Sequence, residues 1–145
     1  MANSTALDTL GSAKYISLTT FRKDGTPVAT PVWLVRTGDA LSVITDPMSG
    51  KAKRLRNNPA VLVSPCDMRG RVKPDAISVV GTVTFQDDVQ TNATMAAIAA
   101  KYGLMGRLIT KMNERKARKA GHGDAGHAGL TITFPEGADG RTRSN

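Results

Sequence analysis

A strand that runs directly into a short basic helix is the feature that most constrains the fold of this chain. Residues 40–45 form an apolar run typical of a β-strand, and the chain then breaks at Asp46-Pro47, because proline fixes φ and removes a backbone donor. Ser49 is a good helix N-cap residue, so about two helical turns are predicted after it, ending before Pro59. The sequence therefore predicts a strand–turn–helix unit.

The predicted helix carries cations beside its own N-terminus. Ala52 and Leu55 are three positions apart and are predicted to share its buried face, which leaves the basic side chains to solvent or to a ligand. The free N–H groups of a first helical turn, together with nearby cations, form an anion site. We therefore predict that Lys51, Lys53 and Arg54 bind a phosphate, with a solvated basic face as the alternative.

Length and cysteine content indicate one domain in a reducing environment. At 145 residues the chain can bury a core without disulfides or metals, and we predict a single domain over 1–135 and a disordered polar tail over 136–145. Cys66 is the only cysteine, which excludes an internal disulfide and favours a buried structural thiol over a nucleophile. The sequence shows no signal-peptide pattern and no membrane-spanning apolar run, so a cytoplasmic location is expected.

The net charge of +8 indicates an anionic partner, which could be nucleic acid, a membrane surface or a polyanionic small molecule. Aromatic residues make up only 4% of the chain, whereas proteins that stack bases interleave aromatic with basic side chains. We therefore expect a small-molecule partner, and neither a membrane nor nucleic acid. A nucleic-acid-binding module is a distant alternative that the charge alone supports.

Short strand-like runs dominate the rest of the chain. They predict strands at 15–20, 27–36, 40–45, 60–66, 76–85 and 130–134. Helices are predicted at 4–10 and from Asp87 or Asp88 to Tyr102, where Gly103 interrupts the pattern before a second helical segment. Pro31 predicts an edge strand or a bulge with free backbone groups. Mostly antiparallel strands with helical insertions predict an α+β fold built on a small β-barrel.

Three segments carry a resemblance to a known family. They are K-Y-I-S-L-T-T-F-R-K-D-G-T-P-V-A-T-P-V-W (14–33), T-D-P-M-S-G-K-A-K-R-L-R-N-N-P (45–59) and V-V-G-T-V-T-F (79–85). With these segments the chain resembles the split β-barrel proteins of the pyridoxamine-phosphate-oxidase-like superfamily over about residues 7–134. Thr30-Pro31-Val32-Trp33 and the spacing T-x-x-x-S-G-K-x-x-x-L-x-x-N-P resemble the branch that binds the deazaflavin coenzyme F420, rather than the branch that binds flavin mononucleotide (FMN).

The resemblance implies a six- to seven-stranded antiparallel split β-barrel that pairs as a homodimer. It also implies that F420 lies in a groove between the subunits, with its ring against the strand at 29–33 and its phosphate and glutamyl tail at the basic segment. The cofactor-binding residues predicted in this way are Thr30, Pro31, Val32, Trp33, Thr45, Ser49, Lys51, Lys53 and Arg54. Trp33 as a plain core residue is the alternative to Trp33 at the ring. Tyr102 and Gly103 are predicted either to reach the partner's cofactor or to be only a helix end with a glycine stop.

The sequence offers no nucleophile–base pair and no carboxylate pair, which suits a protein whose cofactor performs the chemistry. The predicted function is an F420-dependent oxidoreductase that transfers a hydride from reduced deazaflavin to a small molecule. The alternatives are FMN in the same fold and a cofactor carrier without turnover. His122 and His127 lie in a glycine-rich loop, and their spacing lacks the preorganisation of a metal site, so no metal is expected. A mobile loop without a role is the first interpretation, and a loop that orders over the substrate is the alternative.

Overall fold

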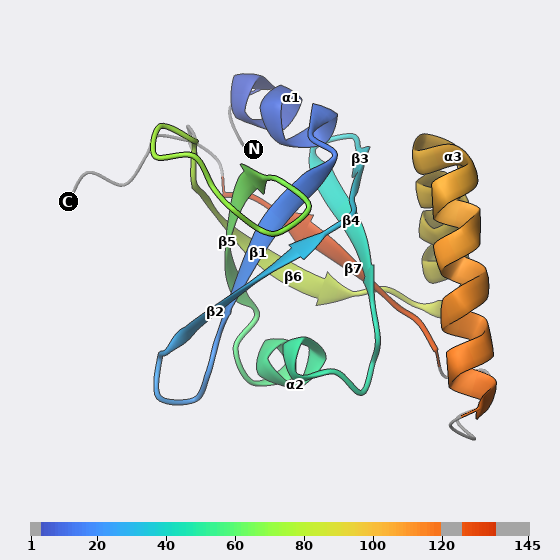
Figure 1. Cartoon of the computed structure of the whole chain (residues 1–145). Coiled ribbons are helices and arrows are strands. Elements are labelled where there is room, and N and C mark those ends of the chain that lie inside the picture. The colour runs from blue at the N-terminus through green and yellow to red at the C-terminus, as the bar shows by residue number, and fades with distance from the viewer. Residues whose placement is uncertain (1–3, 120–125, 136–145) are drawn as a thin grey trace.

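A curled, seven-stranded antiparallel sheet forms the body of the protein (Figure 1). The computed structural model describes residues 4–119 and 126–135. The strands follow the order β2-β1-β5-β6-β7-β4-β3 across the sheet. The elements are α1 Ser4–Ser12, β1 Tyr15–Phe21, β2 Pro27–Val32, β3 Val35–Thr37, β4 Ala40–Thr45, α2 Gly50–Asn57, β5 Ala60–Cys66, β6 Val79–Phe85, α3 Asp88–Lys119 and β7 Ala128–Thr133. This architecture confirms the predicted α+β split barrel.

The sheet is split between two strands that are neighbours in the sequence. β2 and β3 lie at opposite edges of the sheet, although only Trp33 and Leu34 separate them in the chain. The prediction of one strand over 27–36 is therefore wrong, because side chains from α3 bind the Leu34 backbone where a continuous strand would use it for pairing. The edge position that Pro31 predicts for β2 is confirmed, since β1 is its only neighbour among the strands that the structure describes.

Two other strand boundaries differ from the predicted ones. The strand predicted at 76–85 begins only at Val79, because a hydrogen-bonded turn precedes it. The strand predicted at 130–134 is Ala128–Thr133 instead, so Gly129 belongs to the sheet and not to a loop. This second difference matters because Gly129 lies where α3 packs closely on the sheet.

The concave face of the sheet encloses the hydrophobic core. Leu7 and Leu10 of α1 pack against one end of the core, and Leu55 of α2 packs against the other. Figure 1 shows the two helices at opposite ends of the curled sheet. Ala52 and Leu55 are both buried, as their spacing predicts, so the position of α2 at the open end of the barrel is fixed by apolar packing.

α3 covers the outer side of β7 and β4, on the right in Figure 1. Its N-cap is Asp87, whose carboxylate oxygen accepts from the Gln90 N–H at 2.8 Å. Gly103 has φ +62°, a value that favours glycine, and it breaks the helix at the predicted place. Lys101 and Tyr102 are therefore the last two residues of the first helical segment.

A buried polar network joins the start of α3 to the sheet. The Gln86 amide nitrogen donates to the hydroxyl oxygens of Ser42 at 3.2 Å and Thr131 at 2.9 Å, and its amide oxygen accepts from the Thr94 hydroxyl at 2.8 Å. The backbone N–H of Gln86 donates to the Gly129 carbonyl at 2.8 Å. Each hydrogen-bonding atom of the Gln86 side chain therefore has a protein partner.

Two predictions concern residues outside the described ranges: the tail at 136–145 and the role of His122. His127 is described and is half-buried. Among the side chains that the structure describes, at 5–103 and 126–135, no three histidine, cysteine, aspartate or glutamate residues gather as metal ligands would. No helix in this part of the chain is long and apolar enough to cross a membrane.

Candidate functional site

The N-terminus of α2 is built as the sequence predicts. The Ser49 hydroxyl oxygen accepts from the Ala52 N–H at 3.1 Å, which satisfies one of the free donors of the first turn. The Thr45 hydroxyl, at the end of β4, lies 3.3 Å from the Ser49 hydroxyl. Because Thr45 is buried and Ser49 is engaged in capping, these two residues mainly hold the helix end against the strand.

Arg54 folds back over the first turn of its own helix. Its Nε donates to the hydroxyl oxygen of Thr20 at 2.6 Å, and its Nη1 lies 2.9 Å from the position that a Cβ on Gly50 would occupy. A guanidinium group at a helix N-terminus places like charge beside the positive end of the helix dipole. This arrangement is unfavourable by itself and becomes favourable when an anion binds there.

Lys51 is the second cation of this site. Its side chain is half-buried, and burial, followed by the nearby Arg54 charge, lowers the pKa of its amino group below the ordinary value of 10.5. Among the described residues the ion pairs are Arg36–Asp8 and Arg71–Asp67, so Lys51 and Arg54 have no carboxylate partner there. Two adjacent, partly desolvated cations without a counter-charge are an arrangement that a bound anion would stabilise.

The other two cations of α2 point to solvent. Lys53 is exposed. Arg56 is exposed as well, and it donates to the Pro47 carbonyl at 2.8 Å while its guanidinium carbon lies 5.4 Å from the centre of the Phe85 ring. The basic segment is therefore uneven, because Lys51 and Arg54 face the protein whereas Lys53 lies where solvent screens its charge.

On the edge strand β2, one buried side-chain polar atom has no partner among the described residues. The Thr30 hydroxyl oxygen is buried and makes no hydrogen bond to any described residue. A buried hydroxyl without a partner costs free energy, so a ligand that bonds to it gains affinity. Val32 is buried in the core and can offer a ligand only its backbone, whereas Pro31 is exposed and has Gly70 of the 67–75 loop packed near its ring.

Trp33 belongs to a cluster of aromatic side chains. Its ring stacks on Tyr102 with centroids 4.4 Å apart and planes 9° apart, and Tyr15 lies tilted at 6.4 Å. The chain has one tryptophan and two tyrosines, so all of them meet at this place. Trp33 is half-buried, so part of its ring contacts the core and part faces solvent, unlike a fully buried core residue.

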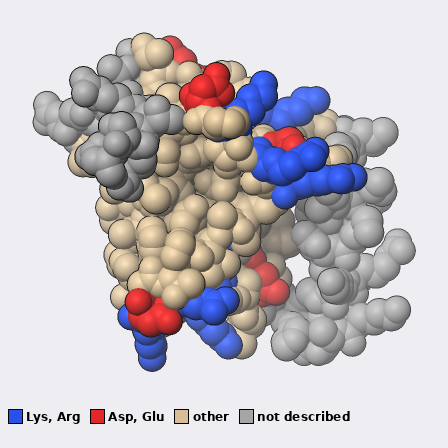
Figure 2. Space-filling view, turned by 60° about the vertical axis from the view of Figure 1, so that its left-hand side comes forward, with Lys and Arg blue, Asp and Glu red and all other residues tan. Residues whose placement is uncertain are grey.

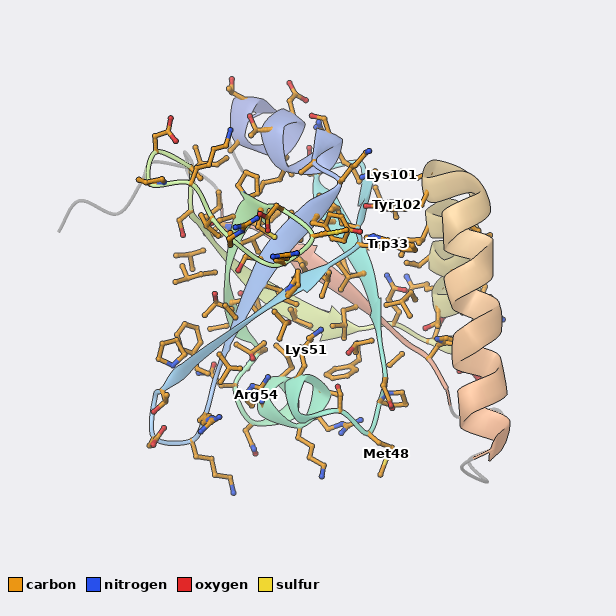
Figure 3. The ribbon with its side chains drawn as sticks, in the orientation of Figure 1. Trp33, Met48, Lys51, Arg54, Lys101 and Tyr102 are labelled. Carbon is orange, nitrogen blue, oxygen red and sulfur yellow. The ribbon has the colours of Figure 1, made fainter. Side chains whose placement is uncertain are left out.

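Figure 3 shows that the predicted residues form two groups at the two ends of one region. Lys51 and Arg54 lie at α2, whereas Trp33 lies near Tyr102 and Lys101 towards the other end of the sheet. Thr30 is between them on β2, since Arg54 binds Thr20 and Thr20 pairs with Val28 of that strand. The roles assigned to these residues remain predictions.

Sequence patterns missed two contributors to this region. Thr20 reads as an ordinary inward-facing strand residue, yet its hydroxyl holds Arg54 in place. Lys101 reads as an exposed helical lysine, yet its amino group donates to three backbone carbonyls, those of Gly11, Ala13 and Leu34. Spacing along the chain carries no signal for either contact, because the partners lie 34 to 90 residues away.

The outer face of β1, β5 and β6 is uncharged. Val80 on β6 is 54% exposed, and the strand register places it beside Leu62 of β5, which in turn lies beside Thr19 of β1. Figure 2 brings forward the left-hand side of Figure 1 and shows a broad area without charged side chains between two charged ends of the molecule. A broad uncharged face with an exposed valine is typical of a protein–protein interface.

The fold is shared with several proteins of known structure. An F420 reductase is similar at 20% identity over 88% of this chain and 91% of that chain, with a TM-score of 0.60. A heme storage protein from Vibrio cholerae is similar at 12% identity over 97% and 96% of the two chains, with a TM-score of 0.66. A FAD-binding protein from Mesorhizobium loti is similar at 18% identity over 94% and 90%, with a TM-score of 0.59.

These identities establish a common fold and leave the ligand open, since the three proteins differ in what their names say they bind. A comparison with curated proteins gives no match. The family model of pyridoxamine 5'-phosphate oxidase matches residues 4–137, which is almost the whole chain. The protein therefore belongs to the pyridoxamine 5'-phosphate oxidase family of split β-barrels.

Proposed function

We propose that this protein is an F420-dependent oxidoreductase that reduces a small molecule in a groove formed by two subunits. The observation that carries the proposal is the pair of adjacent cations at α2, Lys51 and Arg54, which have no carboxylate partner among the described residues. F420 carries a phosphate and a glutamyl tail, so it presents several negative charges to such a pair. FMN, with a single phosphate, is the alternative cofactor.

The residues present fit such a cofactor at both ends. Lys51 and Arg54 would hold the anionic tail at the N-terminus of α2, where the helix dipole favours negative charge. Thr30 would bond through its unpartnered hydroxyl, and Trp33 would form a flat wall for the ring. When bound, reduced F420 would supply a hydride to an electrophilic acceptor. The task of the chain's own residues is to bind the cofactor, to orient it towards the substrate and to exclude water.

Titration of the purified protein with F420, with a deazaflavin that lacks the glutamyl tail, and with FMN tests the proposal. We expect F420 to bind most tightly, and its affinity to fall with added salt more steeply than that of the tailless compound, because salt screens the tail–cation attraction. Tighter binding of FMN would assign the site to the alternative cofactor. Oxidation of bound reduced F420 only when an α,β-unsaturated carbonyl compound is added would distinguish an enzyme from a carrier.

We also propose that the uncharged face of β1, β5 and β6 is where two copies of the chain pair. The face is uncharged and carries an exposed valine, Val80. Burying this face against a second copy would remove apolar surface from water and would leave no charged side chain buried without a partner. A symmetric pair would bring the partner's residues to the edge strand β2 and complete the groove beside Thr30 and Trp33.

Size-exclusion chromatography with light scattering tests the pairing. We expect a mass of twice that of one chain for the wild type, and a shift to monomer for Val80→Glu, because a buried, unpaired carboxylate costs several kcal/mol per subunit, on the order of the values for isolated buried charges. Val89→Glu is the matched control, since Val89 is 78% exposed and lies on α3. A wild-type monomer at micromolar concentration would contradict the proposal.

A further inference from the structure

Lys101 and Tyr102 bind the two-residue link at which the sheet is split. The Leu34 N–H donates to the Tyr102 hydroxyl oxygen at 3.1 Å, and the Leu34 carbonyl accepts from the Lys101 amino group at 3.0 Å. Leu34 follows the last residue of β2 by two positions and precedes β3 directly, so no strand pairing is assigned to it. The two side chains therefore supply the hydrogen bonds that a neighbouring strand would otherwise give.

The same two residues also hold the start of β1. The Lys101 amino group donates to the carbonyls of Gly11 at 3.2 Å and Ala13 at 3.1 Å, and the Tyr102 hydroxyl donates to the Lys14 carbonyl at 2.7 Å. α1 has no basic residue in its own last turn, so the Lys101 ammonium supplies the positive charge that favours a helix C-terminus. The end of α1, the start of β1 and the end of β2 are thus fixed to one point on α3.

Trp33 is the residue that this arrangement orients. It directly precedes Leu34, whose backbone is bound on both sides, and its ring lies parallel to the Tyr102 ring at 4.4 Å. A half-exposed tryptophan on a free link samples several staggered rotamers, whereas stacking on an anchored tyrosine selects one of them. Figure 3 shows Lys101, Tyr102 and Trp33 side by side at the end of the region away from α2.

We infer that Lys101 and Tyr102 are positioning residues, which hold Trp33 and the end of β2 in the one orientation that receives the planar ring of the cofactor. The identity of the ligand rests on the proposed function, whereas the orientation of Trp33 does not. The two ends of the region then have different tasks: α2 binds the anionic tail, and the Lys101–Tyr102 pair orients the surface that receives the ring.

The fluorescence of Trp33 tests this inference without any ligand, because Trp33 is the only tryptophan of the chain. In Lys101→Met and Tyr102→Leu we expect its emission anisotropy to fall and its quenching by acrylamide to rise, since the ring is no longer held. Tyr102→Phe keeps the stacked ring and loses the hydroxyl, so it should lie between these variants and the wild type. Unchanged anisotropy and quenching in Lys101→Met and Tyr102→Leu would overturn the inference.

Thr94→Ala is the control for general loosening of α3. Its hydroxyl bonds to Gln86, which lies two residues before the start of α3, so its loss should lower the melting temperature. We expect Thr94→Ala to leave the Trp33 anisotropy at the wild-type value at temperatures where the protein is folded. An equal loss of anisotropy in this variant would mean that any weakening of α3 frees Trp33, which contradicts a specific role for Lys101 and Tyr102.

Binding measurements then separate the two ends of the region. We expect Tyr102→Leu to weaken F420 and the tailless deazaflavin alike, by about fivefold, the factor expected for one neutral hydrogen bond or stacking contact. Arg54→Ala should weaken F420 and leave the tailless compound nearly unchanged. A Tyr102→Leu loss confined to F420 would contradict a role at the ring. If the wild type bound no deazaflavin or flavin, the proposed function would fall, and the fluorescence results would still decide the inference.

Discussion

Gly129→Ala is expected to lower the free energy of unfolding by about 2–4 kcal/mol, the sum of several lost neutral hydrogen bonds. A Cβ at this position would lie 2.0 Å from the Gln86 amide oxygen and 2.8 Å from the Thr91 hydroxyl oxygen. Real Cβ atoms never approach so closely, so the Gln86 side chain must leave. It would then lose its bonds to the three hydroxyl groups of Ser42, Thr131 and Thr94.

A double-mutant cycle with Gln86 shows whether this clash is the cause. Gln86→Ala alone removes the same three hydrogen bonds and is expected to be destabilising by a similar amount. In that background Gly129→Ala should cost much less than in the wild type, because the side chain that opposes the new methyl group is gone. Chemical denaturation of the four proteins provides the measurement. Additive costs of the two substitutions would show that the effect of Gly129→Ala does not act through Gln86.

The Gly129 case also shows what limits prediction from the sequence. The alternation of apolar residues predicts the last strand at 130–134. Because glycine has no side chain, this pattern gives no sign that Gly129 also belongs to the strand. Gly129 is required by Gln86, whose side chain comes from a residue 43 positions earlier and meets it only after β6 and β7 pair. Local pattern thus predicts that a strand exists, whereas its ends depend on packing between distant segments.

The basic helix was predictable for the opposite reason. Its N-cap at Ser49, its buried pair Ala52 and Leu55 and its end before Pro59 all follow from neighbouring residues, and the structure confirms each of them. Which cations face the protein did not follow from spacing. Lys51 and Arg54 are half-buried because the helix docks against β1, where Thr20 accepts a hydrogen bond from Arg54.

The link between β2 and β3 shows a third kind of limit. The run at 27–36 is rich in β-branched residues, so propensity favours one strand. Two side chains on α3 override it by binding Leu34. Whether Trp33 lines a pocket or a core depended on Tyr102, which is 69 residues away and stacks on it. Local structure could be predicted where one segment makes it, as in α2, and not where several segments meet, as around Trp33.

Lys51→Met is expected to raise stability and to weaken cofactor binding. The wild-type ammonium is partly desolvated next to Arg54 and lacks a carboxylate partner among the described residues, so replacing it by an apolar side chain of similar length removes an unfavourable charge. We expect the free energy of unfolding without cofactor to rise by about 1 kcal/mol, typical of the relief of a strained functional site. F420 affinity should fall by about 1.5–3 kcal/mol, the range for a hydrogen bond to a charged group.

Lys53→Met is the matched variant on the same helix. Its side chain is exposed, so we expect a change in stability within about 0.5 kcal/mol and a smaller loss of affinity that disappears in high salt. Thermal or chemical denaturation without cofactor, and isothermal titration with F420, measure the two effects separately. Equal affinity losses in the Lys51→Met and Lys53→Met variants would mean that the helix acts as a diffuse basic surface and not as a shaped site.

The pH dependence supplies an independent check on the same residue. In the folded protein the pKa of the Lys51 amino group is lowered from its ordinary value of 10.5. The unfolded chain, whose lysine has the ordinary pKa, therefore keeps this proton up to a higher pH than the folded protein does. The cost of the buried charge is therefore fully present below the lowered pKa and is relieved as pH rises through it towards that of the unfolded chain. Over the same interval the amino group loses the charge that holds an anion, so F420 affinity should fall while stability rises. In Lys51→Met the rise of stability with pH should be smaller, because the lowered pKa of the Lys101 amino group remains, and the fall in F420 affinity over this interval should be absent. A wild type whose F420 affinity stays level until ordinary lysines titrate would contradict the assignment of Lys51 to the tail.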